Sequence, residues 1–309
     1  MRKKIIYGCM GLGGGETVIS GQEMKKAFNA FDSAFEAGIR HFDLADIYNG
    51  GRSEVVFGKW LQMNPSIRKE IFIQSKCGIQ LHVGPLNSSF YNFSPQYIIN
   101  QVEKSLAQIQ INTLDMLFLH RPDPLARAED LKDVFLLLKS TGKVQNFGVS
   151  NMSAGQIEWI SRATGEPVKA NQIQFGLGHA LMLDHQAQVN TYTGNGYGLE
   201  GMQQYSMMHN IELQAWRPLD KGRFLSIHAD SSACEYETSG LLKKVAEKYD
   251  VSPSAVALNW VMQVPNGIAP VIGTTNPSRI KALAQALDFE ITREEWYSLW
   301  ITARDKKLP

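Results

Sequence analysis

Short apolar runs alternate with longer segments of helical periodicity along the chain, and this alternation constrains the fold more than any other feature. The runs expected to form strands are 5–9, 41–44, 71–75, 115–119, 144–149, 168–174, 211–216 and 269–272. They are too apolar to leave one face in water, which is typical of a parallel sheet covered by helices. The segments expected to form helices are 23–37, 53–61, 95–109, 128–140, 154–163, 199–209, 240–249, 253–264, 278–286 and 293–300. Ser53, Ser94 and Ser153 are placed to cap three of these helices.

Two topologies satisfy eight strand–helix units joined by right-handed crossovers: a closed eight-stranded barrel and an open doubly wound sheet. The chain has 309 residues, and loop insertions routinely take such barrels past their typical length of about 250 residues. No stretch rich in proline, glycine or serine divides the chain. We therefore predict an α/β fold, a (β/α)8 TIM barrel, as a single domain over residues 1–309 with an extra C-terminal helix.

Charge and cysteine content limit the kinds of binding partner and the cellular compartment that we expect for this protein. Thirty-one basic and 30 acidic residues give a net charge of +1, without the basic surplus of a nucleic-acid binder. Three widely spaced cysteines, Cys9, Cys77 and Cys234, suit neither a disulfide framework nor a zinc site. No apolar run approaches the roughly 20 residues that cross a bilayer, and the apolar stretch near the N-terminus is too short for a signal peptide. We expect a cytoplasmic protein without nucleic-acid or membrane partners.

Three titratable residues stand where consecutive expected strands end. Asp43, Lys76 and His120 occupy these positions, and Tyr48 follows Asp43 by five residues. Each alone has an ordinary explanation, such as a turn residue, a solvated ammonium or a structural histidine. In a parallel barrel, however, the carboxyl ends of the strands form one rim, and this rim carries the chemistry. The four side chains are therefore expected to lie together.

The four groups suit proton donation. A carboxylate beside Lys76 stabilises its ammonium group, and the ammonium is expected to lower the pKa of Tyr48 below its usual value of about 10. A phenol with such a pKa donates a proton to a carbonyl oxygen at neutral pH, and His120 can orient that oxygen. The constellation needs no metal and no nucleophile.

These residues lie in motifs that resemble those of the aldo/keto reductases. The tetrad motifs are Phe42-Asp43-x-Ala45-x-x-Tyr48, Ser75-Lys76 and Leu117-Phe118-Leu119-His120-Arg121. Further matching segments follow in the order of that family, at 142–144, 147–151, 171–172, 215–219 and 272–280. The resemblance runs from about Lys4 to Trp300 and so covers nearly the whole chain.

The resemblance implies reduction of a small-molecule carbonyl by direct hydride transfer from a nicotinamide cofactor. Tyr48 would be the general acid, tuned by Lys76 and Asp43, and His120 would position the substrate oxygen. Met10, Tyr48 and His120 would contact the substrate. We expect no resident metal. We also expect the protein to be a monomer or a weak homo-oligomer.

The resemblance also assigns residues to the cofactor. Ser150, Asn151 and Gln172 would hold the carboxamide and Trp216 would stack on the nicotinamide; Arg217, Pro218, Leu219 and Gly222 would follow the pyrophosphate; Ile272, Gly273, Thr274, Thr275 and Arg279 would surround the adenosine phosphate. Many relatives have Lys or Arg where Gly273 stands. Only Arg279, helped by Thr274, then remains for the 2′-phosphate, so we expect NADPH, with weak discrimination against NADH as the alternative.

Several alternatives stay open from the sequence. The glycine-rich stretch 11–15 fails the Rossmann fingerprint because the last required glycine falls on Glu16, so we interpret it as the first barrel loop. Asp46 is expected at the rim or as a cap. The long connections 78–93 and 175–198 are lids or plain surface loops. The same fold also serves cofactor-binding sensors and regulatory subunits, and retention of all four tetrad residues favours the enzyme.

Overall fold

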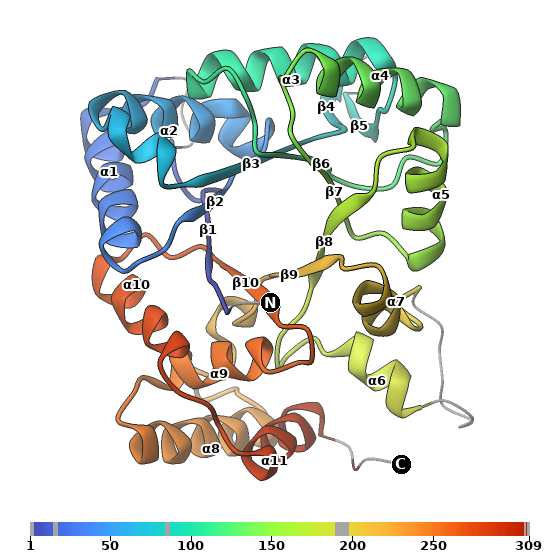
Figure 1. Ribbon diagram of the computed structural model, residues 1–309. Coiled ribbons are helices and arrows are strands. Elements are labelled where there is room, and N and C mark those ends of the chain that lie inside the picture. Colours follow the sequence, from blue (N-terminus) through green and yellow to red (C-terminus); the bar gives the residue numbers. More distant parts are fainter. Residues whose placement is uncertain (1–2, 15–17, 84–86, 189–197, 306, 308–309) are drawn as a thin grey trace.

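The computed structural model describes residues 3–14, 18–83, 87–188, 198–305 and 307. Eight parallel strands close into a barrel in the order β1-β10-β9-β8-β7-β6-β3-β2 (Figure 1). The strands are β1 Ile6–Gly8, β2 His41–Asp43, β3 Phe72–Cys77, β6 Met116–Leu119, β7 Phe147–Ser150, β8 Val168–Gln174, β9 Glu212–Trp216 and β10 Ile268–Ile272. This arrangement confirms the predicted (β/α)8 barrel and excludes the open sheet.

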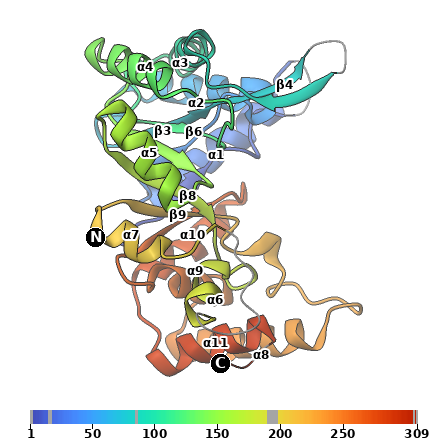
Figure 2. The same ribbon diagram turned by 90° about the vertical axis from the view of Figure 1, so that its right-hand side faces the viewer.

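Helices surround the barrel as an outer ring (Figure 1). They are α1 Gly21–Glu36, α2 Arg52–Met63, α3 Pro95–Ile109, α4 Ala128–Ser140, α5 Ala154–Thr164, α6 Leu181–Ala187, α7 Met202–Met208, α8 Ala233–Tyr249, α9 Pro253–Met262, α10 Pro277–Ala284 and α11 Arg293–Arg304. The predicted extra C-terminal helix is α11, which packs against α8 (Figure 2). No helix in the described ranges is long and apolar enough to span a bilayer.

The caps test the predicted helix starts. Ser153 caps α5 as predicted, and its oxygen accepts the backbone N–H of Gln156 in a capping box. The cap predicted at Ser53 is wrong: α2 begins at Arg52, and the Ser53 hydroxyl instead donates to the carbonyl of Leu12 at 2.7 Å. Ser94 does precede α3, but its side chain makes no capping hydrogen bond.

The connection 78–93 is neither an irregular loop nor a closed lid. It forms an antiparallel hairpin of β4 (Ile79–Val83) and β5 (Ser88–Tyr91), which projects away from the barrel (Figure 2). Phe90 and Tyr91 are 47% and 43% exposed, so the hairpin adds little to the core. In the second long connection, α6 occupies 181–187, and residues 189–197 lie outside the described part of the chain.

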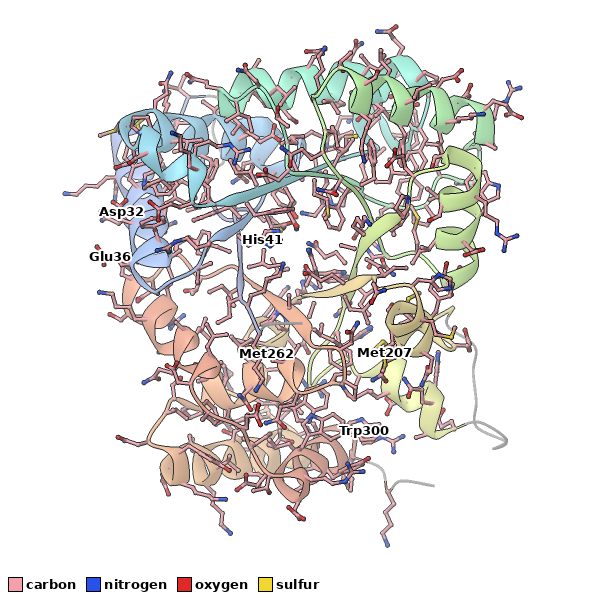
Figure 3. The ribbon with its side chains drawn as sticks, viewed as in Figure 1. Asp32, Glu36, His41, Met207, Met262 and Trp300 are labelled. Carbon is pink, nitrogen blue, oxygen red and sulfur yellow. The ribbon has the colours of Figure 1, made fainter. Side chains whose placement is uncertain are left out.

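Aromatic side chains fill the space between the barrel and its first two helices. Phe31 of α1 meets Phe57 and Trp60 of α2 at ring-centroid distances of 5.2 Å. Phe42 of β2 lies 5.2 Å from Phe57, with its neighbour Asp43 on the opposite side of the strand. Figure 3 marks His41, the first residue of β2, where this strand enters the barrel. The aromatic packing thus holds β2 rigidly beside the site that its last residue builds.

Candidate active site

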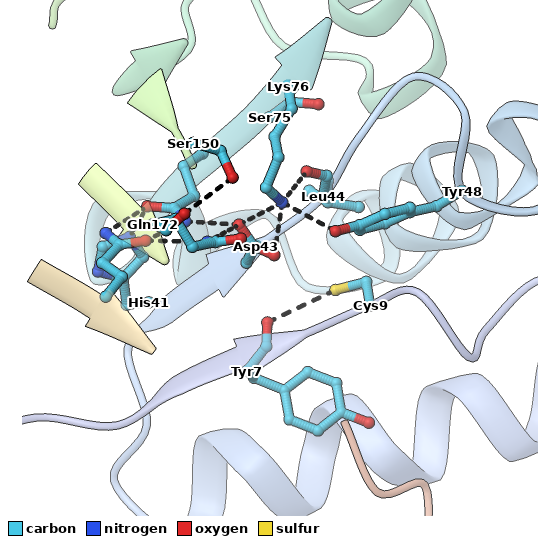
Figure 4. A network of polar contacts seen from close by, with 12 residues as sticks. Tyr7, Cys9, His41, Asp43, Leu44, Tyr48, Ser75, Lys76, Ser150 and Gln172 are labelled. Carbon is cyan, nitrogen blue, oxygen red and sulfur yellow. Dashed lines mark hydrogen bonds and ion pairs between the residues drawn. The ribbon is translucent and has the colours of Figure 1, made fainter. Parts of the chain in front are cut away.

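Barrel register brings the four predicted residues to one rim. Asp43 ends β2, Lys76 lies in β3, and His120 directly follows β6, where its N–H donates to the carbonyl of Cys77 at 2.9 Å. Tyr48 begins a short 3-10 turn after β2. Because β2, β3 and β6 are neighbours in the barrel, the three strand ends converge as predicted. Figure 4 shows the amino group of Lys76 between Asp43 and Tyr48.

A buried ion pair forms the centre of the site. The Lys76 ammonium lies 2.6 Å from both carboxylate oxygens of Asp43, and each residue is only 1% exposed. The ammonium also donates to the carbonyl of Leu44 at 2.9 Å and to the Tyr48 hydroxyl oxygen at 3.0 Å. All hydrogen-bonding capacity of the ammonium is therefore used, which offsets the cost of burying it.

Burial and charge act against each other on these groups. Burial lowers the pKa of Lys76, but the Asp43 carboxylate and the hydrogen bonds outweigh burial, so the pKa is raised and the ammonium stays charged. Burial raises the pKa of Tyr48. The Lys76 charge lowers this pKa by less than burial raises it, so the net pKa is above the usual value. The expected lowering of the Tyr48 pKa is therefore wrong for this structure. The phenol holds its proton at neutral pH.

His120 is a neutral imidazole beside the phenol. Burial lowers its pKa well below the usual value, and the charges of Lys76 and Arg121 lower it further. The rings of Tyr48 and His120 stand 6.0 Å apart at 80°. Nδ1 of His120 is buried without a hydrogen-bond partner in the described part of the chain. A carbonyl oxygen between these two rings would meet two uncharged hydrogen-bond donors.

A network of three glutamines supports Asp43 from below, and sequence reasoning missed most of it. Gln74 and Gln172 donate to one Asp43 oxygen at 2.5 and 3.0 Å, and both donate to the amide oxygen of Gln214 at 2.8 and 3.0 Å. We call these three residues the glutamine floor. The sequence shows each glutamine inside an expected strand but does not indicate that the three amides meet. Gln172, expected at the cofactor carboxamide, thus has its amide nitrogen committed to the floor.

The residues expected around the nicotinamide form a chain of hydrogen bonds across the rim. The Trp216 indole N–H donates to the Asn151 side-chain oxygen at 2.9 Å, and the Asn151 amide donates to the Ser150 hydroxyl at 2.7 Å. The Ser150 hydroxyl donates to the carbonyl of Gln172 at 2.9 Å. These contacts hold the indole at the end of β9, half-exposed toward the rim.

The loop after β9 has an unusual backbone. Four of its residues have positive φ: Arg217, Asp220, Lys221 and Gly222. Such strain concentrates at ligand-binding loops. The buried Pro218 packs against Gly176, where a side chain would bring its Cβ within 2.9 Å of the Pro218 carbonyl carbon. Leu219 packs against the core. The loop is thereby held close to the barrel while the Arg217 side chain is exposed.

The segment after β10 is open on its outer side. Ile272 ends the strand, and no atom lies within 4 Å of a Cβ placed on Gly273. Tyr7 donates its hydroxyl proton to the carbonyl of Thr274 at 3.1 Å, and Thr275 follows at the rim. Asn276 caps α10 by accepting the N–H of Arg279.

The cofactor segments fit a ligand that carries phosphate groups. The side chains of Arg217 and Arg279 are exposed, and no hydrogen bond or ion pair engages either guanidinium within the described ranges. Guanidinium groups pair with phosphates in bidentate geometry. Backbone at Gly273 leaves room for close approach. Donors for the phosphate groups of a dinucleotide are therefore available where the resemblance predicts them, whereas Ser150, Asn151 and Gln172 hydrogen-bond within the protein.

Two further expected residues, Met10 and Asp46, differ in burial. Met10, expected beside the substrate, follows β1 and is 63% exposed, and its contact with a substrate stays a prediction. Asp46 caps no helix in the described ranges: it is 4% exposed, and neither carboxylate oxygen has a hydrogen-bond partner there. Burial and the neighbouring Glu54 carboxylate raise the pKa of Asp46 to about 7.

Comparisons with known proteins agree with this geometry. The model of the aldo/keto reductase family matches residues 4–300. The chain is 30% identical over 275 residues to the uncharacterized oxidoreductase YcsN of Bacillus subtilis, with 88% of this chain and 86% of that protein covered. It is 29% identical to a 6-dehydroglucose reductase of Agrobacterium fabrum, with 99% and 95% covered. The fold matches a glycerol dehydrogenase structure from Gluconobacter oxydans with a TM-score of 0.82 at 20% identity, covering 99% and 92% of the two chains. The chain belongs to the aldo/keto reductase family of oxidoreductases.

Proposed function

We propose that this protein reduces the carbonyl group of a small aldehyde or ketone with NADPH, and that NADH is a poorer donor. The observation that carries the proposal is the 3.0 Å hydrogen bond from the Lys76 ammonium to the Tyr48 hydroxyl oxygen. It holds a protonated phenol at the rim with a cation behind its oxygen. Three buried cysteines, none in a disulfide, support a reducing compartment, and we place the reaction in the cytoplasm.

Each tetrad group has one task in this reaction. When bound, the reduced nicotinamide supplies a hydride to the carbonyl carbon. Tyr48 passes its hydroxyl proton to the carbonyl oxygen, and the Lys76 ammonium stabilises the phenolate that remains. Asp43 keeps Lys76 charged. The neutral imidazole of His120 donates a hydrogen bond to the same oxygen and orients it. In alcohol oxidation the same phenolate accepts the proton.

Residues on the opposite part of the rim supply cofactor affinity. Trp216 offers a flat aromatic face for the nicotinamide, with Asn151 and Ser150 beside it. Arg217 would bind the pyrophosphate, and Arg279 would bind the 2′-phosphate that distinguishes NADPH. The similarity to a 6-dehydroglucose reductase supports a carbonyl substrate for the family site but names no substrate for this chain.

Replacing Tyr48 with Phe tests the proposal. Tyr48→Phe removes the proton and keeps the ring, so the turnover rate for carbonyl reduction should fall by about 10²–10⁴-fold. NADPH affinity, measured by fluorescence titration, should stay within about 2-fold, because the hydroxyl faces Lys76. Tyr236→Phe is the matched control, since this exposed hydroxyl donates only to the carbonyl of His228. Near-normal turnover of Tyr48→Phe with intact NADPH affinity would falsify the assignment.

A further inference from the structure

Arg121 reaches across the open end of the barrel. It follows His120 in the connection after β6, and its guanidinium carbon lies 5.8 Å from the ring centre of Trp216 at the end of β9. β7 and β8 separate these two strands in the barrel order. The side chain therefore spans the rim between the proton-donating residues and the expected nicotinamide face.

The charge of Arg121 has no counter-ion in the described part of the chain. No hydrogen bond or ion pair there involves its guanidinium, although the residue is only partly exposed. The nearest carboxylate in sequence is occupied elsewhere: Asp123 accepts the N–H of Phe93 at 2.9 Å and the N–H of Leu125 at 2.9 Å. A partly desolvated guanidinium held only against an aromatic ring keeps most of its hydrogen-bonding capacity free.

This charge acts on the reacting end of the site. Arg121 is one of the two charges that lower the pKa of His120, whereas Lys76 is the other and is already paired with Asp43. The second guanidinium near the indole, that of Arg217 at 5.6 Å, belongs to the strained loop assigned to the pyrophosphate. Arg121 therefore has no role in the cofactor binding or the proton transfer proposed above.

We propose that Arg121 binds an oxyanion carried by the carbonyl substrate, a carboxylate or a phosphate, and so makes this enzyme selective for anionic aldehydes or ketones. The proposal rests on the carbonyl reduction proposed above. The planar guanidinium matches either oxyanion in bidentate geometry.

The test compares substrates that differ mainly in charge. We choose 4-carboxybenzaldehyde and its neutral analogue 4-formylbenzamide for the carboxylate, and glyceraldehyde 3-phosphate and glyceraldehyde for the phosphate. Arg121→Gln should lower kcat/KM for the preferred anionic substrate by about 10–100-fold, as expected for a lost hydrogen bond to a charged group, and should change the neutral partner by less than about 3-fold. Arg121→Lys should recover part of the loss. The substrate pair, carboxylate or phosphate, whose anionic member loses more kcat/KM identifies the oxyanion.

Arg127→Gln is the matched control, because this exposed arginine lies in the same connection, at the start of α4, and makes no side-chain cap. It removes the same charge without touching the rim and should leave the anionic-to-neutral ratio unchanged. Equal losses of Arg121→Gln on charged and neutral substrates would show that Arg121 only supports Trp216, and would overturn the proposal. A loss confined to NADPH affinity would assign Arg121 to the cofactor and overturn it as well.

A binding measurement separates this proposal from the proposed function. Calorimetric titration with 4-(hydroxymethyl)benzoate and 4-(hydroxymethyl)benzamide needs no turnover. Wild-type protein saturated with NADP⁺ should bind the carboxylate more tightly, and Arg121→Gln should abolish that preference. If no aldehyde is reduced but the preference and its loss are observed, the carbonyl reduction fails and the anion site stands. If aldehydes are reduced and neither anion is preferred, the carbonyl reduction stands and the anion site is overturned.

Discussion

Asp46 stands two residues before Tyr48 with its carboxylate buried and without a hydrogen-bond partner in the described ranges. Around it are Glu54 on α2, Lys104 on α3 and Lys76 and Cys77 on β3. Burial first, and then the Glu54 charge, raise the pKa of Asp46 to about 7. At neutral pH this carboxyl is therefore close to half-protonated, unlike an ordinary surface aspartate.

The sign of this shift makes stability depend on pH. An unfolded aspartate loses its proton near pH 3.9, so between about pH 4 and 7 only the folded state keeps the proton of Asp46. That stabilisation is lost as the pH rises through 7. Asp46→Asn cannot ionise, so wild-type stability should fall relative to this variant by about 2–3 kcal/mol between about pH 5 and 8. Urea unfolding at both pH values measures it, with the exposed Asp230→Asn as control. Parallel pH curves for wild type and Asp46→Asn would contradict the burial argument.

The preference for NADPH over NADH can be tested by replacing a single side chain, that of Arg279. Gly273 contributes no charge, so the Arg279 guanidinium is expected to supply most of the affinity for the 2′-phosphate. Arg279→Ala should weaken NADPH binding by about 10-fold or more and change NADH binding by less than about 2-fold, as fluorescence titration reports. The matched control is Arg293→Ala, an exposed arginine at the start of α11. Equal losses for both cofactors would mean that the 2′-phosphate is bound elsewhere.

At the scale of elements, α2 can approach α3 closely because a glycine stands between them. A Cβ on Gly58 would lie 2.8 Å from the carbonyl oxygen of Ile109. Backbone has little freedom to move away, so Gly58→Ala should destabilise the protein by about 1–3 kcal/mol, despite the helix propensity of alanine. Gly155→Ala in α5 is the control, because nothing lies within 4 Å of its Cβ. We expect it to be neutral or slightly stabilising. Equal unfolding free energies for both variants in urea would refute the packing argument.

Elements with strong periodicity were predictable, and those built by local exceptions were not. The sequence predicts all eight barrel strands, because each lies in a short, mostly buried run that precedes a segment of helical periodicity. The β4–β5 hairpin was missed although Ile79, Leu81 and Val83 alternate with polar residues, because β5 is exposed throughout and the segment lies within a connection between barrel elements. The start of α8 was predicted at 240 but lies at Ala233, where Ser232 and Glu235 form a capping box. That S-x-x-E signal was present in the sequence.

The candidate site was predictable to the same degree and for a related reason. Asp43, Lys76 and His120 end consecutive strands, so barrel closure alone brings them together. The direction of the Tyr48 pKa shift was not predictable, because it depends on how deeply the phenol is buried. Contacts between distant strands, such as Gln74 with Gln214, also leave no local pattern in the sequence.

At the scale of the whole molecule, the glutamine floor joins β3, β8 and β9 through the inside of the barrel. Gln214 accepts from Gln74 and Gln172 and donates to Gln74 and Glu212, all within 3.0 Å. Gln214→Leu removes these bonds and leaves buried amides with fewer partners. The free energy of unfolding should fall by about 1–3 kcal/mol. Calorimetry or urea unfolding measures the loss, and the exposed Gln96→Leu on α3 is the control. A variant as stable as wild type would show that the floor adds nothing to barrel stability.

The same floor decides from which side the phenol can be reprotonated. Side-chain amides do not ionise at physiological pH, so they pass no proton upward by titrating. Behind them, burial and the charge of Lys4 lower the pKa of His41 well below its usual value, so this imidazole holds no spare proton. Each carbonyl reduced by the proposed mechanism consumes the proton of Tyr48. Its replacement therefore does not come from the glutamine floor or from His41, and we expect it to come from the solvent side of the site.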